Sequence, residues 1–502
     1  MHPPIKKAIQ ILGIWMALWA LGACSNEPEP AGEVLARIGD RVITTEDFQR
    51  RAEYTLRPDY CAGDNYIHKK IVLNSLIAEK LLALEFSDSP LKSDPTFQAY
   101  IQGRQEQVMR QWMQKTHGRD LVSIDSSALK DAFRLSSRIY HVQFLVLPDS
   151  NAAMGWGRAR RDGIGFNEIA AALTGSDTIP GRAISWFDRE LESVWQVIFE
   201  QEQTKGNVLG PLPLDDGTFI VLRIDGWVDR PDITDDALQQ RWIDVTERMI
   251  ERQADRIYKS YVGELMSDKQ LQLNKPVFWS YSKRISDIYL EAEDEKKQLL
   301  NAAIWEVEEG LLNQEWDELP EVDGSEILFE IDQQEWSIDR FEEYLLKHPL
   351  VFRKRKMNTS EFAEQFKYAI ADLVRDYYIT EQAYRLNYDQ VPNVHQYTET
   401  FEDHYLSRQA RKEYLRSRVK VDSLKQALSN VELIQTYLDP LVDTLQAKYS
   451  PEIKINMELF ESIKLSTVPM MVGNRNVPFP LAVPAFPRLT TDNRIDYGEN
   501  VN

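Results

Sequence analysis

The side chains that could do chemistry are few, and their spacing matches no common metal or nucleotide site. The chain has seven histidines and two cysteines, and none of the histidines has the H-E-x-x-H spacing that holds zinc on a helix. Gly155-Trp156-Gly157 and Gly163-Ile164-Gly165 form neither a P-loop nor a dinucleotide-binding fingerprint. No G-x-S-x-G motif predicts a hydrolase nucleophile. We therefore expect no metal and no cofactor.

The most informative stretch runs from residue 138 to residue 226. Its two ends, residues 138–147 and 217–224, are rich in β-branched and aromatic residues, which favours strands. A helix-like run, 166–173, follows Gly163-Ile164-Gly165, which we interpret as a turn. After it come a Ser-Asp loop, Ser185-Trp186-Phe187, a second amphipathic run to Phe199 and a turn ending in Gly210-Pro211.

This order resembles a parvulin-type peptidyl-prolyl isomerase, whose pattern runs HILV strand, G-x-x-F helix, S-D loop, GWF, helix ending in Phe, G-x-V-x-G-P and G-Y-H strand. The resemblance covers about 90 residues and implies a small antiparallel sheet with helices. Rotation about an X-Pro bond faces a barrier of about 20 kcal/mol because it breaks amide resonance. A cleft lowers that barrier by fitting the twisted imide, with apolar walls for the ring and polar groups for the carbonyl.

Carried over by position, the polar part of that cleft is incomplete. The histidine of HILV falls on Gln143 and the histidine of G-Y-H on Phe219, so both family histidines are replaced. His141 shares the strand face of Gln143, because side chains alternate along a strand. It could reach the mouth of the cleft or be an ordinary strand histidine. A glutamine can still donate and accept hydrogen bonds.

The remaining positions of the resemblance lie on loops and the second helix. The loop hydroxyl falls on Thr174, with Asp177 shortly after, and the apolar ring-binding pair falls near Leu191 and on Val194 or Trp195. We therefore predict Gln143, Thr174 and Asp177 as catalytic candidates. The predicted substrate-binding residues are His141, Leu191, Trp195 and Phe219.

The N-terminus has the pattern of a lipoprotein signal. Lys6-Lys7 precede an apolar run that ends in Leu21-Gly22-Ala23-Cys24, which resembles a bacterial lipobox. The resemblance implies lipidation at Cys24 and, with Ser25 next, sorting to the periplasmic side of the outer membrane. An ordinary signal peptide or a lone spanning anchor is the alternative. Cys61 is then a single thiol, which we expect to be a small packed residue.

Charge excludes one class of partner. The 79 acidic and 59 basic residues give a net charge of -20, which repels nucleic acid phosphates. Nucleic acid is therefore not an expected partner. The charge serves either solubility or an acidic binding surface.

An internal duplication organises the rest of the chain. Residues 34–48 predict a hairpin entering a helix, with a Thr44 cap and Asp47 three residues later. They resemble the opening of the SurA and PrsA group of secreted foldases. Residues 327–341 repeat the pattern of residues 34–48. After them the two copies align at a constant offset of 297 residues, at which Leu76 matches Leu373. Residues 271–274 match 453–456 at an offset of 182, so the second copy lacks about 115 residues.

We therefore predict an α+β, multidomain chain with two mainly helical modules, the first interrupted by a parvulin-like domain. The predicted parts are a signal peptide, 1–24; a tether, 25–33; the first module, 34–136; the parvulin-like domain, 137–228; a helix and strand completing the first module, 229–280; an acidic linker, 281–324; the second module, 325–464; and a proline-rich tail, 465–502.

The resemblance implies an envelope-anchored foldase or chaperone. Its partners would be unfolded or proline-containing exported polypeptides, such as outer-membrane barrel precursors, and the membrane through the lipid anchor. Prolyl isomerisation would be weak or lost because both histidines are replaced. The alternative is a non-enzymatic periplasmic holdase or scaffold lipoprotein.

Overall fold

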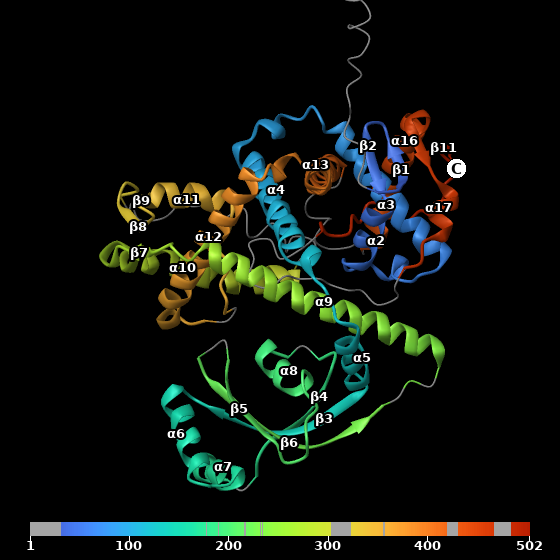
Figure 1. The fold of residues 1–502 in the computed structure, drawn as a ribbon. Coiled ribbons are helices and arrows are strands. Elements are labelled where there is room, and N and C mark those ends of the chain that lie inside the picture. The colour runs from blue at the N-terminus through green and yellow to red at the C-terminus, as the bar shows by residue number, and fades with distance from the viewer. Residues whose placement is uncertain are drawn as a thin grey trace, which may run out of the picture. The chain divides into compact units, whose positions relative to one another are not determined.

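A computed structural model describes residues 32–302, 323–418, 430–465 and 483–501, apart from residues 177, 189, 215, 216, 231, 233, 355 and 356. The chain divides into two compact units. We call residues 114–262 the inserted unit, and the residues up to Met113 and from Gly263 on the main unit (Figure 1). The fold class is confirmed: the chain is α+β, with several small and mainly antiparallel sheets.

The inserted unit is built on one antiparallel sheet in the order β4-β3-β6-β5 (Figure 1). Its two long strands, β3 and β6, are the β-branched runs predicted from the sequence. In their register Gln143 lies opposite Arg223, and Leu147 lies opposite Phe219. The strands are β3 (Arg138–Leu147), β4 (Gly181–Ser185), β5 (Val208–Pro213) and β6 (Phe219–Asp229).

Helices cover both faces of this sheet. On one face α6 and α7 bury Leu145, Leu147 and Val221. On the other face α8 and part of α9 bury Tyr140 and Leu222. The strand alternation of apolar side chains explains why each face has its own core. The helices of this unit are α5 (Ser126–Leu135), α6 (Ser150–Arg161), α7 (Phe166–Thr174), α8 (Glu192–Phe199) and α9 (Asp235–Leu265), the last of which ends just past the division between the units.

The main unit contains two hairpins that each lead into a helix. In the first, Thr44 and Asp47 form the predicted capping box, in which each side chain accepts from the other's backbone N–H. In the second, Ser337 caps the helix at Arg340. The first set is β1 (Val34–Ile38), β2 (Arg41–Thr44) and α2 (Thr45–Glu53), and the second is β8 (Ile327–Ile331), β9 (Gln334–Ser337) and α11 (Ile338–Lys347).

The strands that complete these hairpins are exchanged between the copies. β10 (Ile453–Ile455), from the second copy, pairs with β1, while β7 (Leu271–Leu273), from the first copy, pairs with β8. We predicted that residues 229–280 complete the first module, and this pairing contradicts that assignment. The two strands carry equivalent apolar residues, so each fits the other's hairpin.

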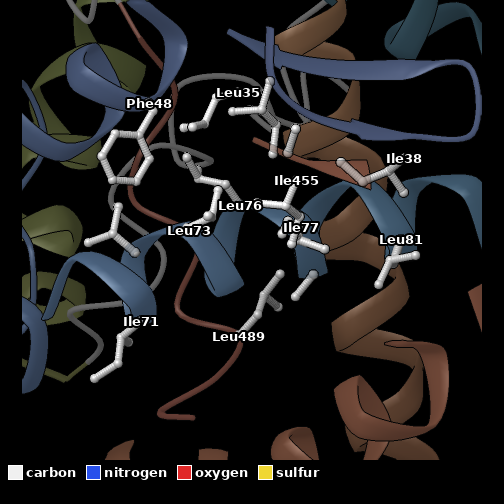
Figure 2. Packing of buried hydrophobic residues seen from close by; sticks show 14 of the residues in the cluster. Leu35, Ile38, Phe48, Ile71, Leu73, Leu76, Ile77, Leu81, Ile455 and Leu489 are labelled. Atoms are coloured by element: carbon white, nitrogen blue, oxygen red, sulfur yellow. The ribbon is translucent and has the colours of Figure 1, made fainter. Parts of the chain in front are cut away.

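The long helices follow the same exchange. α3 (Tyr66–Glu85) packs against α13 (Pro392–Arg418) of the second copy and α16 (Asp439–Tyr449). Figure 2 shows the resulting first core, which includes Leu76 of α3, Leu35 of β1, Ile455 of β10 and Leu489 near the C-terminus. The second core gathers α10 (Lys275–Ala302), α11 and α12 (Thr359–Arg385) around Phe366. α4 (Pro95–Thr116), the first-copy equivalent of α13, approaches this second copy at Gly103, where an added Cβ atom would lie 2.1 Å from the carbonyl oxygen of Lys347.

The structure corrects the predicted linker and places part of the predicted tail. Residues 281–302, predicted as acidic linker, continue α10, and Tyr281 and Ile285 are fully buried in the second core. Residues 303–322 lie outside the described residues. Of the predicted tail, residues 483–501 dock on the first core through Phe486 and Leu489. They end in β11 (Glu499–Asn500), which pairs with β10.

Short elements complete the main unit. The predicted packing of Cys61 is confirmed, because its side chain is buried and burial raises its pKa to about 12. The short helices are Asp59–Cys61, Pro90–Ser93, Tyr388–Gln390, α15 (Asn430–Leu433), the π-helical turn Ile434–Leu438, Ser450–Glu452 and α17 (Met457–Ser462), with Arg119–Leu121 in the inserted unit.

No helix within the described ranges has the length and apolar character needed to cross a bilayer.

Candidate functional site

Part of the sheet in the inserted unit is left open by the helices. α6 and α7 bury the end of β3 that holds Leu145 and Leu147. Further back on the same face, His141 and its partner on β4, Ala183, are exposed, and Gln143 is half-buried. Val228 of β6, opposite Ile139, is 51% exposed. We call His141, Gln143, Ala183, Arg223 and Val228 the shelf.

Arg223 fixes the orientation of Gln143 at the centre of the shelf. One guanidinium nitrogen, Nη2, donates to Oε1 of Gln143 at 2.5 Å, and Nη1 donates to Oδ1 of Asn167 on α7 at 2.5 Å. Nε donates to Asp225 at 3.2 Å. Because a guanidinium can only donate, it faces the amide oxygen of Gln143 and leaves the amide NH2 turned away from it. That NH2 has no hydrogen-bond acceptor among the described residues.

Thr174 does not join this group. Its hydroxyl donates to the backbone carbonyls of Ala170 at 2.8 Å and of Ser176 at 3.2 Å, and it accepts from the N–H of Ser176. The hydroxyl therefore closes the end of α7, where Gly175 adopts a left-handed conformation. Asp177, the other loop candidate, lies outside the described residues.

Of the two apolar candidates on the second helix, Trp195 belongs to the core on the opposite face of the sheet. Trp195 is 3% exposed, and its indole Nε1 donates to the carbonyl of Trp186 at 3.1 Å. Arg252 covers its ring at 3.7 Å. This burial corrects the prediction that Trp195 binds substrate, because its amphipathic helix turns it into the core. Leu191, at the start of α8, is 37% exposed.

Phe219 shares the face of Gln143 but not its position. Phe219 lies opposite Leu147, four residues along β3 from Gln143, which is about 13 Å at the usual rise of a strand. Its ring is half-buried beside α6 and lines a separate hollow of about 480 Å³. Gln143 and Phe219 therefore do not form a single cleft.

Arg223 belongs to the site but could not be predicted from the sequence pattern alone. The signal for it is the strand register: once β3 and β6 are paired, the residue opposite Gln143 decides which of its atoms faces a ligand. Among the described residues, no group of three or more His, Cys, Asp or Glu side chains could hold a metal ion.

Comparisons with known proteins add little to this geometry. Neither a protein-family model nor a curated protein matches the sequence. A structural neighbour is the crystal structure of foldase protein PrsA from Streptococcus pneumoniae str. Canada MDR_19A, at 12% sequence identity and a TM-score of 0.19. The alignment covers 46% of this chain and 94% of that chain. A TM-score of this size supports no inference about this chain, so the function rests on the residues themselves.

Proposed function

We propose that the chain is a chaperone of the foldase kind, whose inserted unit binds extended, proline-containing segments of unfolded polypeptides on the shelf. The observation that carries this proposal is the uncovered strip of sheet on which the amide NH2 of Gln143 lies near exposed Ala183, the strand partner of His141, with exposed Val228 further along the strip, opposite Ile139. An amide NH2 can donate to the carbonyl that precedes a proline. The small side chain of Ala183 leaves room for the ring.

The same geometry favours binding over fast isomerisation. In the parvulin family, which the sequence of this unit resembles, the polar pair is two histidines, and here their positions hold Gln143 and Phe219. Gln143 is locked by Arg223 as a donor, and Phe219 offers the imide no hydrogen bond. Differential stabilisation of the twisted imide needs groups aimed at the transition state, so we propose that any isomerase activity of this chain is slow.

We also propose that the chain acts at the cell envelope. Cys24 and its lipobox-like sequence lie outside the described residues, so the support is the sequence Leu21-Gly22-Ala23-Cys24. Lipid on Cys24 would hold the chain on the periplasmic side of the outer membrane, beside exported polypeptides such as barrel precursors. When cells that express the chain grow with labelled palmitate, the wild-type protein should be labelled and the Cys24→Ala variant should not. Label on both proteins would contradict lipidation at Cys24.

Two assays on the full chain test the main proposal. In a protease-coupled assay with an Ala-Pro peptide, we expect isomerisation at the uncatalysed rate, over tens of seconds. In a fluorescence titration with a labelled proline-containing peptide, Gln143→Ala should weaken binding several-fold, because a neutral hydrogen bond contributes about 0.5–1.5 kcal/mol. Gln196→Ala, a half-buried glutamine on α8, is the matched control and should bind as the wild type does.

The second candidate function is a holdase or scaffold that does not use the shelf. It is favoured by the separation of Gln143 from Phe219 and by the burial of Trp195, which leave the family's cleft unassembled. Suppression of client aggregation that survives Gln143→Ala, with no measurable peptide binding by the wild type in the titration, would support it. Clear acceleration of isomerisation would contradict both candidate functions and would indicate that the chain is an active prolyl isomerase.

A further inference from the structure

A second hollow in the inserted unit lies beside α6, away from Gln143. It has a volume of about 480 Å³, and one stripe of α6, from Ser150 to Arg161, forms a wall. Pro211 of β5 and Phe219 of β6 form the facing wall. The stripe residues recur three or four positions apart, so they lie along a single side of the helix. Twelve residues of helix extend for about 18 Å, enough for a short extended peptide.

The middle of the hollow is apolar and open. Met154, on the α6 wall, is 58% exposed. At Gly157 a Cβ atom would meet only the end of the Arg161 side chain, at 3.9 Å. The absence of a side chain at Gly157 therefore keeps the space free beside Phe219.

One end of the hollow is basic. Arg158 and Arg161 line it at the last turn of α6, and both side chains are exposed. Neither forms an ion pair with any residue that the structure describes. The whole chain carries a net charge of -20, so two unpaired guanidinium groups beside an apolar hollow are complementary to a ligand that joins a carboxylate to an apolar group.

We propose that this hollow binds the carboxyl-terminal end of a polypeptide whose last side chains are apolar. Arg158 directly follows Gly157 on α6, so the basic end adjoins the apolar lining, and a ligand residue that carries a carboxylate and an apolar side chain on the same Cα can contact both. A terminal residue carries both on the same Cα. An internal Asp uses its own side chain for the charge and leaves the apolar contact to a neighbour. The inference rests on the proposed function for the ligand class, an unfolded polypeptide, but not on the shelf.

The direct test is a titration of the full chain with a fluorescein-labelled octapeptide that ends in Ala-Leu-Leu with a free carboxylate. Two comparison peptides have an amidated C-terminus. The first has the same sequence, and the second has Asp in place of the seventh residue. We expect the free carboxylate to bind at least about ten-fold more tightly than either, since hydrogen bonds between charged groups exceed neutral ones. Equal affinity for the amidated peptide, or for the internal Asp peptide, would overturn the proposal.

Variants localise the binding. Arg158→Gln with Arg161→Gln should remove the preference for the free carboxylate. Arg160→Gln should keep it, because Arg160 donates to the carbonyl of Ile164 and does not line the hollow. Gly157→Leu should abolish binding by filling the hollow without cost to the helix, since leucine has the higher helix propensity. Equal losses in Arg160→Gln, or full binding by Gly157→Leu, would contradict the site.

The shelf and the hollow can fail independently. Gln143→Ala should weaken binding of the proline-containing peptide and leave the affinity for the free-carboxylate peptide unchanged. If Gln143→Ala weakens both, the two peptides share one site and the separate hollow is refuted. If only the proline peptide fails to bind the wild type, the proposed function fails while the inference on the hollow stands.

Discussion

At the scale of single residues, the main unit depends on charges buried between exchanged elements. Arg51 of α2 makes two hydrogen bonds, of 2.8 and 2.9 Å, to Glu79 of α3, and His404 of α13 lies 2.8 Å from the same carboxylate. Asp403 pairs with Lys80 at 2.7 Å. A buried carboxylate is stable only with such partners. These contacts therefore tie α13 to the first copy by charge as well as by packing.

Glu79 gives the pH dependence of this network. Burial alone would raise the pKa of Glu79, but Arg51 and His404 outweigh it and lower the pKa to about 2, with Lys80 also nearby. A carboxyl with a lowered pKa stabilises the fold above its ordinary pKa of 4.5, and that contribution is lost as pH falls toward 2. Denaturant unfolding at pH 7 and at pH 3 should show the loss.

Glu79→Gln isolates this effect. At pH 7 it should lower the free energy of unfolding by about 3–5 kcal/mol, because Arg51 stays buried without its partner. The deficit should shrink at pH 3, where the wild-type carboxylate contributes less. Glu247→Gln, in an exposed pair with Arg119, should cost less than about 1 kcal/mol. A deficit for Glu79→Gln that is independent of pH would contradict the account.

At the scale of elements, Gly103 allows α4 to pack closely against the second copy. A Cβ atom at Gly103 would lie 2.1 Å from the carbonyl oxygen of Lys347. Helix propensity favours alanine by about 1 kcal/mol, yet the clash should make Gly103→Ala destabilising by about 1–3 kcal/mol. At Gly155 of α6 nothing lies within 4 Å, so Gly155→Ala should stabilise its unit. Thermal unfolding of both variants measures the opposite signs.

The exchange of strands can be tested by cross-linking. Arg37 of β1 lies opposite Lys454 of β10, and directly paired strand residues have Cα atoms close enough for a disulfide. Arg37→Cys with Lys454→Cys should therefore form an intrachain disulfide under mild oxidation. Arg37→Cys with Gln272→Cys uses the equivalent position of β7 and should stay reduced. Cys61 is a poor competitor, because burial raises its pKa. A disulfide in the second pair alone would refute the exchange.

At the scale of the whole molecule, the exchange makes the two cores unequal in their dependence on the C-terminus. The first core needs α13, α16, β10 and residues 483–501, whereas the second core is made by residues before 391. A chain that ends at residue 391 should lose the first core and keep the second. In hydrogen exchange, the amides of α3 should then exchange rapidly while those of α12 stay protected. Protection of α3 in the shortened chain would contradict this.

The sequence predicted the duplication but not its connectivity. The constant offset identified both hairpins, and Thr44 with Asp47 predicted the cap. Residues 271–273 and 453–455 have the same alternating apolar pattern, however, so strand pairing energy cannot tell which hairpin each completes. That choice depends on how the whole chain closes. For the site, the sequence placed Gln143 and Phe219 together by family position, whereas the register of β3 and β6 sets them four residues apart.

The central claim, that proline-containing segments bind on the shelf, is tested most directly by photocross-linking. A proline-containing peptide with benzoylphenylalanine beside the proline would be irradiated with the full chain, and the attached residues mapped by mass spectrometry. We expect attachment within residues 139–143, 181–185 and 223–228, reduced several-fold by Gln143→Ala. Attachment confined to residues 32–113 or 263–501, unchanged by Gln143→Ala, would contradict the claim.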